Sequence, residues 1–524
     1  MDSKTRIAKA AGLMSVATFI SRILGYVKDM VLAGYFGASG ISDTFFVAFR
    51  IPNLLREIFA EGSMSSAFIP VLTDYRTRHG EEEAKRLVRI TFTFIILFVG
   101  LICLAGILFA PAIVSVIAPG FRNNPERFSQ TVLLTRIMFP FLLFISLAAL
   151  VMGALNIKRI FFVPSLAPAM LNVSIITAVL LLVPFLEQPI IAVAAGVTLG
   201  GLVQFAFQMP VFFKNDYSLR PAYEFGHPGL KRMSILILPA TMGMAVAQVN
   251  IFISTILASY LPQGSITYLY YSMRLIQFPI GIFGVAMGMA VLPSLSEHAS
   301  RGETRKLRDD FSFALRLLFF ITVPAMAGLI ALREPIVNIL FQRGLFDYNA
   351  TAGTADALLF YATGIWAIVG VRIVTATFYS LHDTKTPVRV AVIAMLTNIV
   401  MSLILMNPLK HSGLALANAS ASGLNFLLLF YFLRKKMGSI DARRIISSFM
   451  KICLASAFMG VTGWVIIRGD IWKAGGMVME KTLYLSGTIL LSVIIYSVAC
   501  HLLKSDELYY LYSAFKDKLR RRNS

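Results

Sequence analysis

The stretch "ITFTFIILFVGLICLAGILFA", residues 90–110, contains no charged side chain. As a helix it rises about 30 Å, the thickness of the hydrocarbon core of a bilayer. A second such run, "TLYLSGTILLSVIIYSVACHLL", covers residues 482–503. The whole chain is 57% hydrophobic and 14% charged, whereas soluble domains have about 25% charged residues. The sequence therefore predicts an all-α polytopic membrane protein.

Fourteen apolar segments qualify as transmembrane helices. They cover residues 8–34, 44–72, 88–118, 130–156, 162–185, 189–212, 233–260, 267–296, 308–332, 353–380, 388–407, 411–433, 445–467 and 482–503. Arg22 and Lys28 interrupt the first segment, and no small-residue cleavage site follows it, so we expect a retained helix rather than a signal peptide.

The formal net charge of +21 is concentrated in alternate loops. "TRHGEEEAKRLVR", "SRGETRKLR" and "RKKMGSIDARR" are basic, whereas "GASGIS", "PFLEQP" and "YLPQGS" on the opposite side contain no lysine or arginine. This positive-inside bias predicts that both termini are cytoplasmic. The basic tail, 504–524, is interpreted as an amphipathic segment on anionic membrane lipid, and nucleic acid is not an expected partner.

The first and second parts of the chain resemble each other at an offset of about 223 residues. "FFVAFRIPN" (45–53) aligns with "YYSMRLIQF" (270–278), which places Arg50 within a residue of Arg274. "LAGILFAPAIVSVI" aligns with "MAGLIALREPIVNIL", and two further loop matches occur in the same order. Because each half has an even number of spans, six, both halves start on the same side of the membrane and have the same orientation. We therefore expect two pseudo-symmetric six-helix lobes, 1–215 and 216–436, related as parallel repeats, with two extra helices over 437–503.

Charged side chains lie on particular faces of three of the predicted spans. At 100° per residue, Asp43, Arg50, Glu57 and Glu61 fall within about 40° of one another on the second span. Arg22 shares a face of the first span with Asp29, flanked by Ser21 and Lys28, and Arg274 and Gln277 lie on a glycine-rich face of the eighth. A charge at the bilayer centre costs from about 3 to more than 10 kcal/mol unless it meets water or a partner. These stripes predict one water-filled cavity between the halves.

Two interpretations of these charges stay open. For Asp29, Glu57 and Glu61, ion pairs that hold the helices together within the membrane are as good an explanation as a role in the cavity. Arg22, Lys28, Arg56 and Arg274 outnumber the nearby acids, which favours an anionic substrate. Because guanidinium groups match phosphate oxygens bidentately, we expect a phosphorylated substrate that can be lipid-linked.

The segments "SRILGYVKD" (21–29) and "PNLLREIFAEGSMSSAFIP" (52–70) resemble the lipid II flippases of the MurJ (MviN) family, within the MOP exporter superfamily. The resemblance extends over essentially the whole chain in span number and order. It implies a bacterial inner-membrane protein of cell-wall (peptidoglycan) biosynthesis. It would move lipid II, the undecaprenyl-pyrophosphate-linked disaccharide-peptide, from the cytoplasmic to the periplasmic leaflet by alternating access. Spans 13 and 14 would form a groove for the lipid tail, and cell-wall synthesis enzymes are implied partners.

The family's essential cationic residues correspond by position to Arg22, Lys28, Arg56 and Arg274, with Asp43 at the start of the second helix. Lys28 stands where relatives often have arginine, and Met273 and Gln277 where some have acids. The seventh span has no acidic residue, which argues against a sodium site seen in one relative. Coupling to the membrane potential or to another monovalent ion is left open, and no cofactor is expected.

Motifs of enzymes are missing from the sequence. There is no GxxxxGK[ST] loop, no GxSxG elbow, no metal-ligand spacing among the six histidines and no disulfide framework among the three cysteines. We therefore expect a transporter with no catalytic residues and no metal site. The alternative is another MOP-type exporter, of drugs or of a different polyprenyl-linked glycan. An integral-membrane enzyme of polyprenyl phosphates would need a carboxylate cluster in a cytoplasmic loop, and none occurs.

Overall fold

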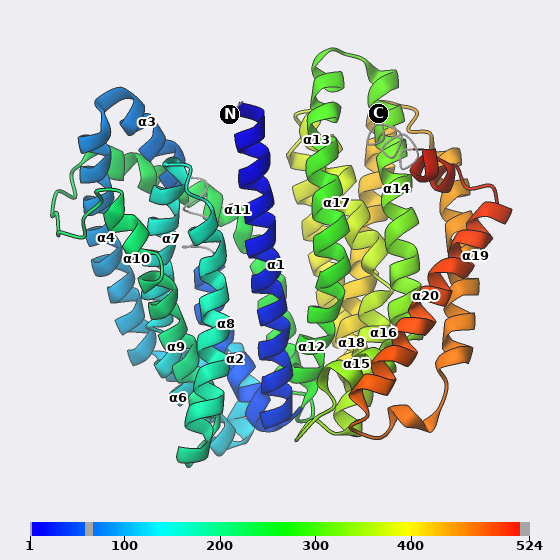
Figure 1. The fold of residues 1–524 in the computed structure, drawn as a ribbon, viewed down its shortest axis with the longest axis horizontal. Coiled ribbons are helices and arrows are strands. Elements are labelled where there is room, and N and C mark those ends of the chain that lie inside the picture. The colour runs from blue at the N-terminus through cyan, green and yellow to red at the C-terminus, as the bar shows by residue number, and fades with distance from the viewer. Residues whose placement is uncertain (1–2, 58–66, 514–524) are drawn as a thin grey trace. The chain divides into compact units, whose positions relative to one another are not determined.

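The computed structural model describes residues 3–57 and 67–513, and within these ranges it contains helices and no strand (Figure 1). The chain divides into two compact units, Met1–Ile266 and Thr267–Ser524. Ten helical segments of the described residues are long and apolar enough to cross a membrane. The prediction of an all-α membrane protein is confirmed.

The first unit contains α1 to α11. Their bounds are α1 Ser3–Phe36, α2 Gly40–Arg56, α3 Ile69–His79, α4 Glu81–Leu108, α5 Ala110–Ile117, η3 Pro119–Asn123, α6 Pro125–Met138, α7 Phe141–Ile157, α8 Phe162–Leu182, η4 Val183–Phe185, α9 Ile190–Ala206, α10 Met209–Lys214 and α11 Pro228–Ser259. Helix α8 packs against α1 and α9, α7 packs against α4 and α9, and α2 packs against α6. The predicted second span starts in α2 and ends in α3, and Glu61 lies outside the described residues.

The second unit contains the remaining helices. Their bounds are α12 Ser265–Pro279, η5 Ile280–Gly284, α13 Val285–Ser300, α14 Thr304–Ala331, α15 Arg333–Phe341, α16 Tyr348–Ala362, α17 Ile365–Ser380, α18 Lys385–Met437, α19 Ala442–Ile467, η6 Asp470–Trp472 and α20 Val478–Leu502. Helix α14 packs against α17 and α19, α17 against α18, and α19 against α20. The unit boundary falls inside α12, so α11, which the repeat assigns to the second lobe, packs with the first unit.

Local sequence signals explain several helix boundaries. The Ser39 side chain accepts a hydrogen bond from the Ser42 amide and caps α2, and Asn124 caps α6, which begins at Pro125. Gly80 has a φ of 91°, a left-handed conformation that separates α3 from α4. In α18 the backbone leaves helical geometry at Lys410, with φ 50° and ψ −131°, two residues after Pro408. The break falls between the segments 388–407 and 411–433 that the sequence separates.

Buried polar groups fix the loop between α19 and α20. The Asn338 side chain donates to the Trp472 carbonyl at 2.6 Å, and the Lys481 ammonium donates to Asn338 Oδ1 at 3.0 Å. The Trp472 indole packs in an apolar cluster with Leu332 and Leu485. The loop after α19 is therefore held by α15 and by the first turn of α20.

We expect a Gly120→Ala substitution to destabilise the first unit by about 1–3 kcal/mol. A Cβ atom at Gly120 would lie 2.3 Å from the Ser259 carbonyl oxygen, and backbone at this contact cannot move aside cheaply. The measurement is the thermal unfolding midpoint of the purified protein in detergent. Gly100→Ala is the control, because a Cβ there meets no atom within 4 Å. Equal midpoints for the two variants would contradict the prediction.

We expect Asp383→Asn to lower stability at neutral pH by about 1 kcal/mol. The Asp383 carboxylate accepts hydrogen bonds from Lys436 Nζ at 2.8 Å and from the Thr386 amide at 3.0 Å. Above all the Lys436 ammonium lowers the pKa of Asp383 from 3.8 to about 2. A depressed pKa contributes stability that is complete above about pH 4 and disappears as the pH falls toward 2.

Thermal unfolding of the Asp383→Asn variant and the unmodified protein between pH 7 and pH 3 measures this contribution. The difference should stay constant down to about pH 4 and shrink below it. Glu187→Gln is the control, because Glu187 is exposed and forms no ion pair within the described residues. A difference that grows on acidification would show that the interaction has been assigned the wrong sign.

Candidate functional site

The predicted site residues of α1 divide into a paired and an exposed group. Lys28 Nζ lies 2.9 Å from Asp29 Oδ1, and the Asp29 side chain is fully buried. Arg22, six positions earlier, is exposed, and the backbone carbonyl of Ser21 accepts a hydrogen bond from Asn172 of α8 at 3.3 Å. The ion-pair interpretation therefore applies to Asp29, with its chain neighbour as the partner.

At the end of α2 the predicted residues Arg56 and Glu57 form one polar network. Arg56 Nε donates to Asn53 Oδ1 at 3.1 Å, and Asn53 Nδ2 donates to Glu57 Oε1 at 3.2 Å. Gln248 of α11 donates to the other carboxylate oxygen of Glu57 at 2.6 Å. The Arg56 guanidinium lies 3.9 Å from Glu57. Glu57 thus links α2 to α11, and through Asn53 it restricts the orientation of Arg56.

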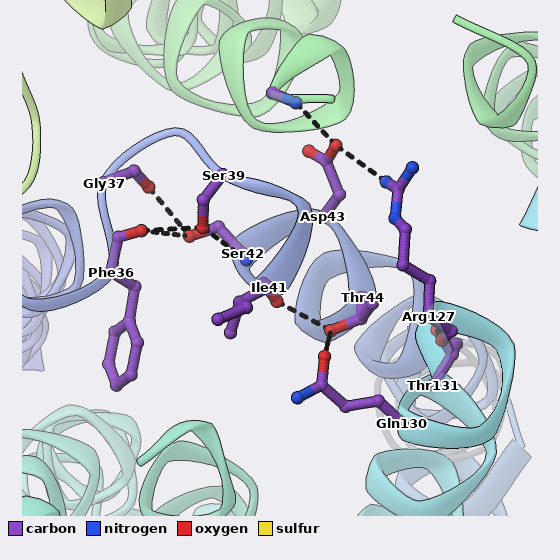
Figure 2. A network of polar contacts seen from close by, with 11 residues as sticks. Phe36, Gly37, Ser39, Ile41, Ser42, Asp43, Thr44, Arg127, Gln130 and Thr131 are labelled. Atoms are coloured by element: carbon purple, nitrogen blue, oxygen red, sulfur yellow. Dashed lines mark hydrogen bonds and ion pairs between the residues drawn. The ribbon is translucent and has the colours of Figure 1, made fainter. Parts of the chain in front are cut away.

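Asp43, in the first turn of α2, is a buried acid with two donors (Figure 2). Its side chain is 1% exposed, and Oδ2 accepts from Arg127 of α6 at 3.2 Å and from the Gly264 amide at 2.8 Å. The next residue, Thr44, donates to Gln130 of α6 at 3.0 Å. Asp43 therefore joins the start of α2, α6 and the loop that precedes α12.

Arg127 was not among the residues predicted from the sequence. Its guanidinium carbon lies 4.3 Å from the centre of the Phe121 ring, and its amide is capped by Asn124 Oδ1 at 3.1 Å. The "NNPER" pattern could have located this helix start. It could not have indicated that Arg127 binds Asp43, because the two residues are 84 positions apart.

In the second unit Arg274 is half-buried on α12 and Gln277 is exposed. Helix α12 ends at Pro279 and continues as a π-helical turn, Ile280–Gly284. A Cβ at Gly284 would lie 3.1 Å from Val369 and 3.5 Å from the Arg372 Cδ atom, both on α17. The glycine therefore allows α17 to approach closely.

Arg372 is a cationic residue that the sequence analysis missed. It is exposed in the middle of the apolar helix α17, and within the described residues no carboxylate lies at ion-pair distance from it. A cation at this depth is favourable only beside water or an anion. Its signal in the sequence was an isolated charge in "GVRIVTATFYS", the same signal that identified Arg274.

The structure groups the predicted residues by unit. Ser21, Arg22, Lys28, Asp29, Asp43, Arg50, Arg56 and Glu57 belong to the first unit, and Arg274 and Gln277 to the second. Among the described residues, no group of three or more histidine, cysteine, aspartate or glutamate side chains is placed to hold a metal ion. The predicted residues of the two units carry guanidinium, ammonium, amide, hydroxyl and carboxylate groups on largely apolar helices.

A sequence model of the family described as lipid II flippase MurJ matches residues 32–486. The chain belongs to the MurJ family. A probable lipid II flippase MurJ of Vibrio cholerae is 36% identical over 499 residues, covering 94% of this chain and 95% of the relative. The lipid II flippase MurJ of Burkholderia cenocepacia is 36% identical over 423 residues, covering 80% and 82%.

A solved MurJ structure agrees with this assignment. A lipid II flippase MurJ in an inward closed conformation matches with a TM-score of 0.77 and 28% identity, over 94% of this chain and 99% of that one. An inward-facing multidrug resistance transporter of the MATE family, in the MOP superfamily, matches with a TM-score of 0.65 and 14% identity, which indicates a shared fold. MurJ relatives are named as flippases, which are transporters rather than enzymes. This MurJ family member is a multi-pass membrane protein.

Proposed function

We propose that this protein is a lipid II flippase, which moves the lipid-linked peptidoglycan precursor from the cytoplasmic to the periplasmic leaflet of the bacterial inner membrane. The observation that carries the proposal is the match to the MurJ family over residues 32–486, with 36% identity to a protein named as a lipid II flippase. The cationic residues of α1, α2 and α12 supply the chemistry that a pyrophosphate group requires.

The proposed architecture has fourteen transmembrane helices, as two six-helix lobes that are parallel repeats and two C-terminal helices that guide the lipid tail. The break at Lys410, which divides α18 into two segments, supports this count. Both termini would lie in the cytoplasm, as the distribution of lysine and arginine predicts. The lobes would rock about a central cavity and expose it to each leaflet in turn.

In this mechanism Arg22, Arg56 and Arg274 bind the pyrophosphate. Guanidinium groups can each donate two hydrogen bonds to phosphate oxygens, and they stay charged at any physiological pH. The hydrogen bonds among Asn53, Glu57 and Arg56 restrict the Arg56 side chain before substrate arrives, which reduces the entropy lost on binding. Arg372 of α17 adds a further cation in the unit that contains Arg274.

The membrane potential can contribute to the direction of transport. Moving one elementary charge through 100 mV is worth about 2.3 kcal/mol. Because the cytoplasmic side of the bacterial inner membrane is negative, outward movement of an anionic pyrophosphate is favourable by this amount for each charge that crosses. A monovalent ion is the alternative source of coupling.

The test is complementation in a bacterium whose own lipid II flippase is depleted. We expect this gene to restore growth and to make lipid II accessible in the outer leaflet, measured with an enzyme or probe that cannot cross the membrane. An empty vector is the control. Protein that accumulates in the membrane without restoring outer-leaflet lipid II would refute the assignment and favour another exporter of the MOP superfamily.

A further inference from the structure

A polar pocket of about 330 Å³ lies in the second unit, away from Arg274 on α12. It is formed by α14, the first three turns of α19 and the residues that follow α20. Its lining contains the cations Arg316, Arg443, Arg444 and Lys451, the acids Asp441, Asp506 and Glu507, and the hydroxyls of Ser447 and Ser448. The loops at this end of α14 and α19 are among those that the charge distribution predicts to be cytoplasmic.

The inner wall of the pocket is a closed hydrogen-bond network around Glu507. One carboxylate oxygen accepts from Arg316 Nη1 at 2.6 Å and from Ser448 Oγ at 2.9 Å, and the other accepts from Ser505 Oγ at 2.7 Å. Glu507 is 3% and Arg316 is 5% exposed. The negative charge of Glu507 is therefore compensated within the wall.

The outer wall presents the cations Arg443, Arg444 and Lys451 and the acids Asp441 and Asp506. Arg443, Ser447 and Lys451 are spaced by four residues, so they share one face of α19. Within the described residues Arg443 has no ion-pair partner, and Lys451 Nζ donates to the backbone carbonyl of Lys504 at 3.2 Å. Arg444, on the adjacent face, lies 3.0 Å from Asp506. Asp441 accepts a hydrogen bond from Ser312 Oγ at 3.2 Å. With Asp506 paired to Arg444, the side chains of Arg443, Lys451 and Ser447 remain available toward the pocket.

Apolar side chains run beside these donors along the same helix. Ile446, Met450 and Leu454 are each three positions beyond a donor and are 56%, 62% and 62% exposed. On a helix apolar enough to cross a membrane, such a stripe faces acyl chains. A molecule with a phosphate at the pocket and a hydrocarbon chain along α19 would satisfy both features.

We propose that this pocket binds the phosphate headgroup of an anionic glycerophospholipid of the bilayer, with an acyl chain along Ile446, Met450 and Leu454. Basic pockets between transmembrane helices on the cytoplasmic side recognise such headgroups. Arg443 and Lys451 neutralise the phosphate and Ser447 donates a hydrogen bond to it. The lipid stays bound to the protein and is distinct from the transported substrate. It stabilises the packing of α19 against α14.

The test uses the purified full-length protein in detergent, with lipid binding measured by native mass spectrometry and by thermal shift. Phosphatidylglycerol is titrated against phosphatidylcholine, which has no net charge, and against inorganic phosphate. We expect saturable binding of phosphatidylglycerol, weakened about tenfold or more by the double substitution Arg443→Ala and Lys451→Ala. The control pair Arg434→Ala and Lys435→Ala, two exposed cations at the end of α18 that do not line the pocket, should bind within twofold of the unmodified protein.

Ser447→Glu is the second variant. It places a negative charge at an exposed position of the pocket and should also abolish the phosphatidylglycerol shift, so the test survives if the double variant is unstable. Unchanged binding in a folded double or Ser447→Glu variant would overturn the proposal. So would equal binding of phosphatidylcholine, or a shift by inorganic phosphate as large as that by the lipid, which would indicate a site for the free ion.

Discussion

An Asp43→Ala variant should lose about 3–5 kcal/mol of folding free energy in the first unit. The substitution removes the acceptor of Arg127 and of the Gly264 amide at a position that is 1% exposed. It leaves a largely buried guanidinium and a buried amide without that acceptor, and such groups pay their desolvation cost in full. We expect a large drop in membrane abundance and in the unfolding midpoint.

A double-mutant cycle with Arg127→Ala separates the ion pair from other effects of Asp43. If the pair is the cause, the double variant should be more stable than the sum of the single effects implies. Asp470→Ala, at a 91% exposed acid, is the control. An Asp43→Ala protein of normal abundance and midpoint that fails to transport would contradict this structural role and favour direct contact with substrate.

Replacing Arg274 with alanine should weaken substrate capture ten- to a hundredfold. The lost charge-assisted hydrogen bonds to phosphate are worth roughly 1.5–3 kcal/mol. Lysine should rescue only in part, because it keeps the charge but loses the planar fork. The measurements are lipid II binding to purified protein and complementation, with membrane abundance determined in parallel.

The alternative for Arg274 is that it only neutralises an acid such as Asp43 or Glu57. Within the first unit Asp43 accepts from Arg127, and Glu57 accepts from Gln248 and Asn53, so both acids have other donors. Arg301→Ala, at an exposed arginine paired with Glu297, is the matched control. Normal growth of the Arg274→Ala strain, or inactivity explained by failure to accumulate, would remove the substrate role.

The sequence was sufficient for the fold class because membrane helices must bury apolar surface over a fixed length. The isolated charges on α1, α2 and α12 were visible for the same reason, since each is costly in an apolar helix. Periodicity reports the face of a helix on which a residue lies, but not which helix packs there. The Gly264 amide that donates to Asp43 is 221 positions away in the sequence, and Gln248, which donates to Glu57, is 191 positions away. Neither hydrogen bond was predicted.

The π-helical turn after Pro279 shows a second limit of prediction from the sequence. A helical wheel assumes a constant 100° per residue, and the widened turn changes the face on which residues after Ile280 lie. Gly284, which α17 approaches closely, is the last residue of that turn. The predicted glycine-rich face of the eighth span is therefore continuous in the sequence, whereas the helix that contains it is not regular.

The buried Arg316–Glu507 pair has a consequence for biosynthesis. The two residues are 191 positions apart. A ribosome that adds about 5–20 residues per second therefore needs roughly 10–40 s to reach Glu507 after it has added Arg316. During this interval α14 enters the membrane with an arginine that still requires water, lipid phosphate or a chaperone. The Arg316–Glu507 hydrogen bond can form only after α20 has been synthesised. A chain that stops before Glu507 would thus keep Arg316 without its buried carboxylate partner, and the charge of Arg316 would have to be neutralised by water or by lipid phosphate.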